Sequence, residues 1–257
     1  MNVNKKKIIT WRMMLYELRN ITGNPFVHIF GIGMPLFMAV FITRTAVSEM
    51  TDTAMVKNVS TSIFLGIGAL IPMATVLMGY AVLHAQELEK GIPERLQLFG
   101  IKNYVTICNR ALSELIFLSV AFALYFLTGI LFMDLEAPVF SGFLLYVICI
   151  ACFSAICFAI GHAIAALAKR FSVTYCITML VYFACMMLGG MMGISYENMP
   201  PILQAAAKLL PVTYFSRDFF TIWTGETYNF ISMIQAYLFF GAVTGILLFA
   251  ATRKNTR

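Results

Sequence analysis

Residues 139–167 read VFSGFLLYVICIACFSAICFAIGHAIAAL and contain no charged side chain. A helix needs about 20 mainly apolar residues to cross a bilayer, and one charge at its centre costs about 2.5–3.5 kcal/mol. Backbone groups in lipid find no water partner, and the run does not alternate as a barrel strand would, so we expect a membrane-spanning α-helix. Five more runs share these properties: 26–43, 63–83, 115–133, 173–194 and 230–252.

The composition also indicates an integral membrane protein. The mean hydropathy is +0.84 and only 12% of the side chains are charged, which lies outside the range of soluble globular proteins. Six spans and their connections account for the 257 residues, so we expect one transmembrane domain over residues 1–257. The six cysteines lie in or beside the apolar runs, which favours packing over a disulfide framework or a metal site.

Positive charge is distributed unevenly among the connections. If the N-terminus lies in the cytosol, fourteen Lys and Arg residues, Lys5, Lys6 and Lys7 among them, fall on the cytoplasmic side and four on the other. Lys and Arg mark the cytoplasmic side of membrane proteins. We therefore expect a multi-pass protein of a bacterial plasma membrane with both termini in the cytosol. The net charge of +6 then reflects topology and not nucleic-acid binding.

The segment before the first run predicts an amphipathic helix on the inner leaflet. Its apolar residues are spaced three, four and three: Ile8, Trp11, Leu15 and Leu18. Arg12, Tyr16 and Arg19 occupy another face, and Gly23-Asn24-Pro25 should end the helix. The alternative is an ordinary frayed tail.

The connection after the second run, residues 86–102, holds six charges in seventeen residues. Gly91 should end the span, and Pro93 suits the first turn of a new short helix, with Glu94 favourable near its N-terminus. Apolar residues within a charged rim indicate a docking surface, although a solvated turn is the alternative. The residues expected to form this surface are Glu87, Gly91, Glu94, Arg95, Leu96, Leu98 and Phe99.

The connection between the last two runs is long for a simple loop. Pro200 and Pro201 should start one helix over 202–210, and Pro211 a second one that runs to about Trp223. Gly225 should end it. Both pieces are too short to span, so we expect a helical hairpin over residues 197–226 that dips into the outer leaflet.

The sequence lacks the residues that are characteristic of several classes of function. No phosphate-binding loop of the form GxxxxGK[ST] occurs, so we expect no ATP hydrolysis by this chain. The three histidines, His28, His84 and His162, lie near the cytoplasmic ends of runs and are interpreted as interfacial polar residues. The methionines at the outer end of the fifth run are interpreted as packing residues in preference to a Cu(I) site: Met186, Met187, Met191 and Met192.

The runs also lack the titratable groups that proton- or sodium-driven transporters carry within the membrane. The nearest such group is Glu114, with Arg110 one helical turn before it. We expect an ion pair between positions i and i+4 at the membrane edge. Arg110 and Glu114 are also candidate residues of a cytoplasmic gate.

The chain resembles permeases of the type-two export class of ABC transporters, the drug, peptide and polysaccharide exporters. The resemblance covers nearly the whole length and rests on four features. The first two are the N-terminal helix and Asn24-Pro25 followed by Pro35. The third is ELEKGIPERL at residues 87–96, close to the family pattern ExxGxxExL with the first Glu displaced by one. The fourth is the late series Gly189-Gly190, Pro200-Pro201 and PVTY at residues 211–214. Ile92-Pro93 replaces the usual Thr-Leu, and Arg217 stands where an acidic residue is expected.

The resemblance implies roles for these segments. The short helix after the second span would be the coupling helix that enters a groove on the ATPase. The late segment would be a re-entrant hairpin that caps the pathway, with Gly189, Gly190, Pro200, Pro201, Pro211 and Tyr214 as its marker residues. ATP and magnesium would bind the partner, and this chain would need no cofactor.

The resemblance thus implies the membrane subunit of an ATP-driven exporter. Its partners would be two ABC ATPase subunits, a second permease copy or a homologous permease, and the lipid bilayer, with no nucleic acid. Few polar residues lie within the spans, which suggests an amphipathic or hydrophobic substrate such as a drug, lipid or antimicrobial peptide. The alternatives from other classes are a secondary multidrug transporter or channel, and an intramembrane enzyme.

Overall fold

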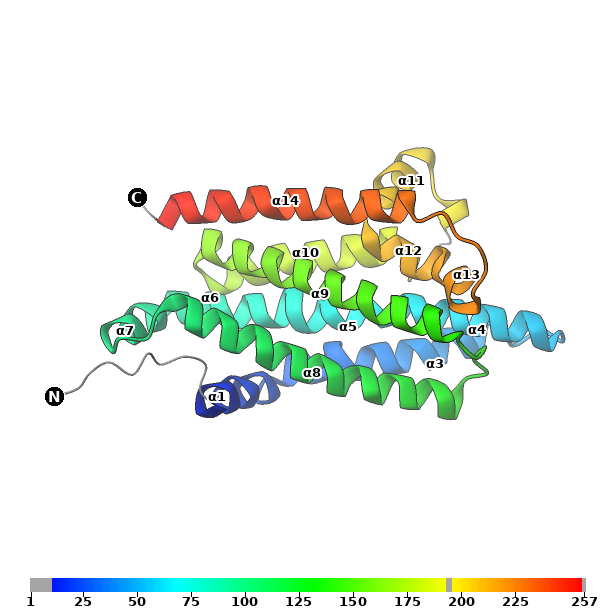
Figure 1. Ribbon diagram of the computed structural model, residues 1–257, viewed down its shortest axis with the longest axis horizontal. Helices are drawn as coiled ribbons and strands as arrows, with labels where there is room; N and C mark the ends of the chain where they lie inside the picture. The colour runs from blue at the N-terminus through cyan, green and yellow to red at the C-terminus, as the bar shows by residue number, and fades with distance from the viewer. Residues whose placement is uncertain (1–10, 193–195, 256–257) are drawn as a thin grey trace.

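The computed structural model of the protein describes residues 11–192 and 196–255. The fold is 84% helical, and these residues contain no strand. The helices run side by side along one long axis, and α1 and the last turns of α14 lie at the end of the molecule where α7 projects (Figure 1). Predictions that rest on Lys5, Lys6, Lys7, Ile8 and Ile194 fall outside the described residues.

Six helical segments are long and apolar enough to cross a membrane, which agrees with the six predicted runs. The first two are interrupted helices: Pro25–Ala46, made of α2 (Pro25–His28), η1 (Ile29–Gly33) and α3 (Met34–Ala46), and Thr53–Glu89, made of α4 (Thr53–Gly68), α5 (Leu70–Pro72), η2 (Met73–Tyr80) and α6 (Ala81–Glu89). The other four are α8 (Asn103–Phe132), α9 (Phe140–Ala168), α10 (Phe171–Leu188) and most of α14 (Ile231–Asn255).

The remaining helices are short and lie at the two ends of the bundle. At one end are α1 (Trp11–Thr22) and α7 (Ile92–Leu98). At the other are η3 (Tyr196–Asn198), α11 (Pro201–Lys208), α12 (Pro211–Arg217) and α13 (Phe219–Thr224). The second hairpin helix is therefore split at Asp218, where the sequence predicted one continuous piece. The fifth span ends at Leu188, before the predicted Ile194, because Gly190 adopts a left-handed φ of 75°.

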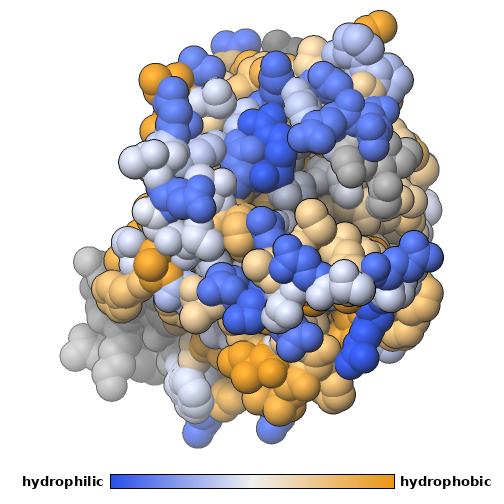
Figure 2. Space-filling view, turned by 90° about the vertical axis from the view of Figure 1, so that its right-hand side faces the viewer, coloured by the Kyte–Doolittle hydropathy of each residue, from blue (hydrophilic) through white to orange (hydrophobic). Residues whose placement is uncertain are grey.

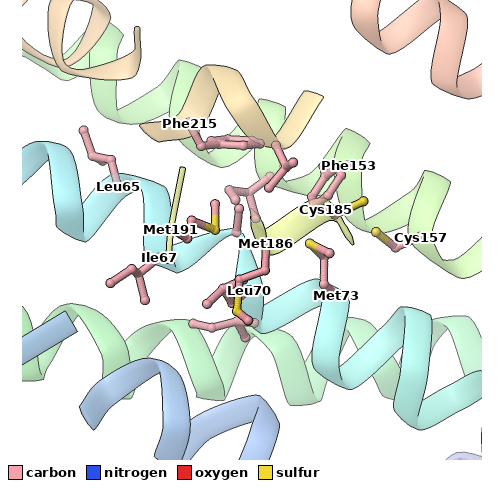
Figure 3. Packing of buried hydrophobic residues seen from close by; sticks show 14 of the residues in the cluster. Leu65, Ile67, Leu70, Met73, Phe153, Cys157, Cys185, Met186, Met191 and Phe215 are labelled. Carbon is pink, nitrogen blue, oxygen red and sulfur yellow. The ribbon is translucent and has the colours of Figure 1, made fainter. Parts of the chain in front are cut away.

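The second span is the centre of the bundle. Its most apolar window is 89% buried, whereas those of the other five spans are 17–39% buried. In Figure 3, Leu65, Leu70 and Met73 of this span face side chains of three other elements: Phe153 and Cys157 of α9, Cys185 and Met186 of α10, and Phe215 of α12. Since lipid is as apolar as these side chains, close packing and not transfer from water is what stabilises this core.

Two tyrosines donate to backbone carbonyls beside an irregularity in the central span. The Ala69 N–H donates to the Gly66 carbonyl at 3.1 Å instead of continuing the α-helical pattern. The Tyr146 hydroxyl donates to the Leu65 carbonyl at 3.1 Å, and the Tyr125 hydroxyl donates to the Phe64 carbonyl at 2.7 Å. The Leu65 carbonyl, which loses the Ala69 N–H as its donor, is thus satisfied from α9, and the Phe64 carbonyl gains a donor from α8.

The first two spans approach closely where both contain a π-helical segment. Each segment adjoins a proline, since Pro35 follows η1 and Pro72 precedes η2. A side chain on Gly31 would overlap that of Thr75, which is held by its own hydrogen bond to the Ile71 carbonyl at 2.8 Å. π-Helical turns often mark functional positions, and small residues allow helices in membranes to pack this closely.

The contact at Gly31 can be tested with one substitution. Gly31→Ala is expected to lower the thermal unfolding midpoint of the purified protein by several degrees, because overpacking costs about 1–3 kcal/mol. Gly33→Ala, in the same π segment, is the matched control, since the nearest atom to its added Cβ is the His28 carbonyl oxygen at 3.5 Å. Equal midpoints for the two variants would contradict this close approach.

Candidate functional site

The short helix α7 stands between the second and third spans. Gly91 adopts a left-handed φ of 64°, which ends α6 and lets the chain turn, and Pro93 lies in the first turn of α7. Gly100, at φ 78°, turns the chain again toward α8. The sequence thus predicted a short helix after Gly91 with Pro93 in its first turn, as the structure has it.

The tip of α7 exposes apolar side chains. Leu98 is 87% exposed and Phe99 is 78% exposed, while Leu96 is half-buried. Glu94 and Arg95 are exposed beside them. Two large exposed apolar side chains thus lie next to charged residues and form a small exposed surface. The helix α7 projects from the end of the bundle where α1 also lies (Figure 1).

A buried ion-pair cluster lies behind α7 and centres on Arg110 of α8. Its Nε donates to Glu17 of α1 at 3.2 Å, its Nη2 donates to Glu87 of α6, and its Nη1 lies 2.8 Å from Nδ1 of His84. All four residues are between 5% and 7% exposed. Because a guanidinium only donates, Nδ1 of His84 accepts, which places the imidazole proton on Nε2. One side chain thus joins α1, α6 and α8.

Two predictions about this cluster were wrong. The sequence placed Glu87 on the exposed rim of the docking surface, but its side chain turns inward because Arg110 attracts it. The expected ion pair between Arg110 and Glu114 is replaced by those with Glu17 and Glu87, which reach Arg110 from other helices. Glu114 is 3% exposed, and within the described residues its Oε2 has no hydrogen-bond partner. A void of about 10 Å³ lies beside it.

The cluster continues toward α9 through residues that the sequence did not single out as a group. The Tyr80 hydroxyl lies 2.8 Å from Nδ1 of His162, and the rings of His84 and His162 stack at 4.8 Å.

The sequence did contain a pattern that indicates burial of Glu17, since Met14 and Ile21 lie three and four residues away on the same helical face. A carboxylate between apolar residues at this spacing indicates a buried acid with a partner.

Burial sets the electrostatics of Glu17, which lies outside the spans. Desolvation raises the pKa of its carboxyl group above the usual range, the nearby Arg110 guanidinium opposes this shift, and Glu87 adds to it. Removal of one member of a buried ion pair typically costs about 3–5 kcal/mol, since the remaining charge is left without a partner. The cluster therefore fixes the relative positions of the three helices strongly.

The opposite end of the bundle carries the other predicted residues. Gly189 and Gly190 end α10, Pro200 and Pro201 precede and start α11, and Pro211 starts α12. The buried Tyr214 donates to the Lys208 carbonyl at 2.9 Å. Figure 2 shows this end face, where hydrophilic residues cover much of the surface and hydrophobic patches lie toward its edge. The structure therefore keeps the α7 residues and the hairpin residues at opposite ends (Figure 1).

Arg217, for which the sequence suggested no partner, forms an ion pair that stabilises the hairpin. Arg217 donates to Asp218 through Nε at 2.5 Å and Nη2 at 2.7 Å, and its guanidinium lies over the rings of Tyr196 and Tyr214. The Tyr228 hydroxyl donates to Asp218 at 2.7 Å. The acidic residue thus follows Arg217 directly, and the pair ties α12 to η3 and to the chain before α14.

In the comparison with protein-family models, residues 7–217 match the model of the ABC-2 type transporter. The chain belongs to the ABC-2 type transporter family. No curated protein and no solved structure matches it. An ABC-2 domain is the transport permease of an ABC transporter and is not itself an ATPase, and the family implies association with an ABC ATPase and with the membrane. The matched residues include α7, the Arg110 cluster and the hairpin as far as α12.

The methionines at the end of α10 are divided between the core and the surface of this ABC-2 permease. Met186 and Met191 are buried in the core, whereas Met187 and Met192 are 41% and 52% exposed, so the methionines do not converge. Within residues 11–192 and 196–255, no group of three or more His, Cys, Asp or Glu side chains is arranged to hold a metal ion. The proposed function below rests on α7 with the Arg110 cluster behind it, and on the hairpin held by the Arg217–Asp218 ion pair.

Proposed function

We propose that this permease is the membrane subunit of an ATP-driven exporter in a bacterial plasma membrane. Two copies, or one copy with a homologous permease, form the pathway for an amphipathic or hydrophobic compound such as a drug, lipid or antimicrobial peptide. Two separate ABC ATPase subunits bind ATP and magnesium and supply the energy. The family match supports the transport role, and the export direction rests on the resemblance to exporter permeases.

The observation that carries this proposal is the apolar tip of α7. Leu98 and Phe99 project from the end of the bundle at the end of a helix too short to span a membrane. A soluble partner with an apolar groove would bury them, and Glu94 and Arg95 would set the register at the rim. An ABC ATPase is the partner that the family implies.

The Arg110 cluster would carry movement from α7 into the spans. The helix α7 connects directly to α6 and α8, and Arg110 ties these two helices to α1. A displacement of α7 by the ATPase would therefore move α1, α6 and α8 together. The π segments η1 and η2 lie farther along the first two spans and are the places where these spans would bend. At the other end of the bundle, the hairpin that is held by the Arg217–Asp218 ion pair would close the pathway on the outer side.

The proposed orientation places α7 and both termini in the cytosol. The test uses a variant from which the native cysteines have been removed. A single cysteine introduced at Thr51 or at Glu226 of that variant is expected to react with a membrane-impermeant maleimide added to intact cells. Cysteines at Lys90 and Lys169 are expected to react only after the membrane is opened. Labelling of position 90 in intact cells would contradict the orientation.

Transport itself is tested by reconstitution. The permease, co-purified with its ABC ATPase, is expected to accumulate a fluorescent amphiphile in inside-out vesicles with ATP and not with a non-hydrolysable analogue. A proton ionophore should leave this uptake unchanged. Uptake that needs no nucleotide and collapses with the ionophore would assign the chain to secondary transport instead.

A further inference from the structure

A cavity at the α7 end of the bundle lies outside the Arg110 cluster. It has a volume of about 380 Å³ and lies between the end of α1, the turn before α2, the segment from η2 to α6, and the start of α10. Small-molecule sites typically occupy about 300–1,000 Å³. Since the first, second and fifth spans all begin or end here, the cavity lies at the level of one membrane surface.

This cavity is lined by both apolar and polar residues. Three of the lining residues form an aromatic group, Phe26, Phe171 and Tyr175, with Phe26 and Tyr175 packed edge to face at 5.8 Å. Val82 and Leu83 of α6 extend the apolar lining. The polar lining includes Arg19 and Asn20 of α1 and Gln86 of α6. It also includes Asn24 in the turn before α2, whose Oδ1 accepts from the Phe26 N–H at 3.1 Å.

Three of these polar side chains are free to bind a ligand. Among the described residues, no hydrogen bond or ion pair within the protein occupies the guanidinium of Arg19 or the half-buried amides of Asn20 and Gln86. The neighbouring carboxylates are engaged elsewhere, since Glu17 and Glu87 pair with Arg110. Glu89 accepts from the Phe171 N–H at 2.9 Å.

These unpaired groups favour an anion. Arg19 is the one charged residue among the described residues that line the cavity, so the lining carries a net positive charge. A guanidinium offers several N–H donors in one plane, and the two amides can add more, which suits a phosphate or carboxylate group. The aromatic and aliphatic wall suits an attached apolar chain.

We propose that this cavity binds the anionic headgroup of an amphiphile that enters from the adjacent leaflet. Arg19, Asn20 and Gln86 hold the phosphate or carboxylate, and the apolar chain runs past Phe26 and Val82. The ligand is either a resident anionic lipid or the transported compound, which share this chemistry. The inference goes beyond the proposed exporter function and does not rest on it, because binding needs no nucleotide.

Binding is measured with the purified full-length permease in detergent, by native mass spectrometry during titration with phosphatidylglycerol or phosphatidylcholine of the same acyl chains. Phosphatidylglycerol is expected to bind at least tenfold more tightly. Arg19→Gln should remove most of this difference, since a charge-assisted hydrogen bond to phosphate is lost. Gln86→Leu should weaken phosphatidylglycerol binding a few-fold. Unchanged melting temperatures will show that both variants fold.

Arg12→Gln is the matched control, since Arg12 is an exposed arginine of the same helix that does not line the cavity. It should bind phosphatidylglycerol like the wild type. Equal binding of the two lipids, or equal losses in Arg12→Gln and Arg19→Gln, would overturn the proposal in favour of diffuse surface attraction. With the ATPase and ATP present, movement of labelled phosphatidylglycerol to the other leaflet would identify the ligand as cargo, and retention would identify a resident lipid. Both results agree with the proposed binding site and differ only in the role of the ligand.

Discussion

Replacement of Leu98 and Phe99 together by aspartate is expected to abolish ATP-driven transport while the permease remains in the membrane at the wild-type level. Both side chains are highly exposed, so the substitutions remove no packing within the chain. They place two unpaired charges in the proposed contact with the ATPase, at a cost of a few kcal/mol. About 3 kcal/mol corresponds to more than a hundredfold weaker association. Co-purification of the ATPase and transport in vesicles measure the effect.

Gln97→Asp is the matched control, since it adds a carboxylate to an exposed polar position on the same helix. It is expected to retain most ATPase association and transport. Wild-type association and transport in the Leu98→Asp/Phe99→Asp variant would show that α7 does not contact the ATPase. Loss of the variant from the membrane would instead show that these side chains stabilise the fold.

Removal of Arg110 is expected to have the largest effect on stability. Arg110→Met leaves the buried carboxylates of Glu17 and Glu87 without their cation, at a cost of about 3–5 kcal/mol. We expect a strongly reduced amount of folded protein and a lower thermal unfolding midpoint. Lys102→Met, which removes an exposed cation just before α8, is expected to leave both quantities unchanged.

A variant in which the three residues of the ion-pair cluster are uncharged separates the effect on stability from the effect on transport. The triple variant Glu17→Gln/Glu87→Gln/Arg110→Met buries no charge at these positions, and replacement of a whole buried ion pair by neutral residues is often nearly neutral. It is expected to recover most of the stability lost in Arg110→Met. If the cluster carries movement from α7, the triple variant should still associate with the ATPase but transport slowly. A triple variant as unstable as Arg110→Met would contradict the ion-pair account.

The sequence predicted the parts of this structure that depend on local patterns. Uncharged apolar runs identified the six spans, although the second span begins at Thr53, ahead of the predicted Ile63. Its first turns carry Lys57, Asn58 and several hydroxyl side chains, so they did not match the pattern of an uncharged apolar run. Asp52 caps this helix by accepting from the Ala54 N–H at 3.0 Å. Gly91 and Pro93 likewise located α7, because backbone geometry restricts where such residues fit.

The sequence did not predict contacts between distant residues. Arg110 lies 93 positions from Glu17 and 23 from Glu87, so the nearby Glu114 was the only partner that helical spacing could suggest. Partner choice depends on how α1, α6 and α8 pack, which a single sequence does not reveal. The break at Asp218 was missed for the same reason, since Asp218 is held by Arg217 and by Tyr228 from another segment.

Site-specific photo-crosslinking from α7 tests the proposed ATPase contact most directly. A photoreactive benzoylphenylalanine at position 99, in cells that contain the ABC ATPase, is expected to form a crosslink that mass spectrometry identifies as that ATPase. The same probe at position 202, where Ile202 is 83% exposed at the opposite end, should not. Crosslinks from position 99 to lipid alone, or ATPase crosslinks from position 202, would contradict the assignment of α7 as the helix that couples this permease to its ATPase.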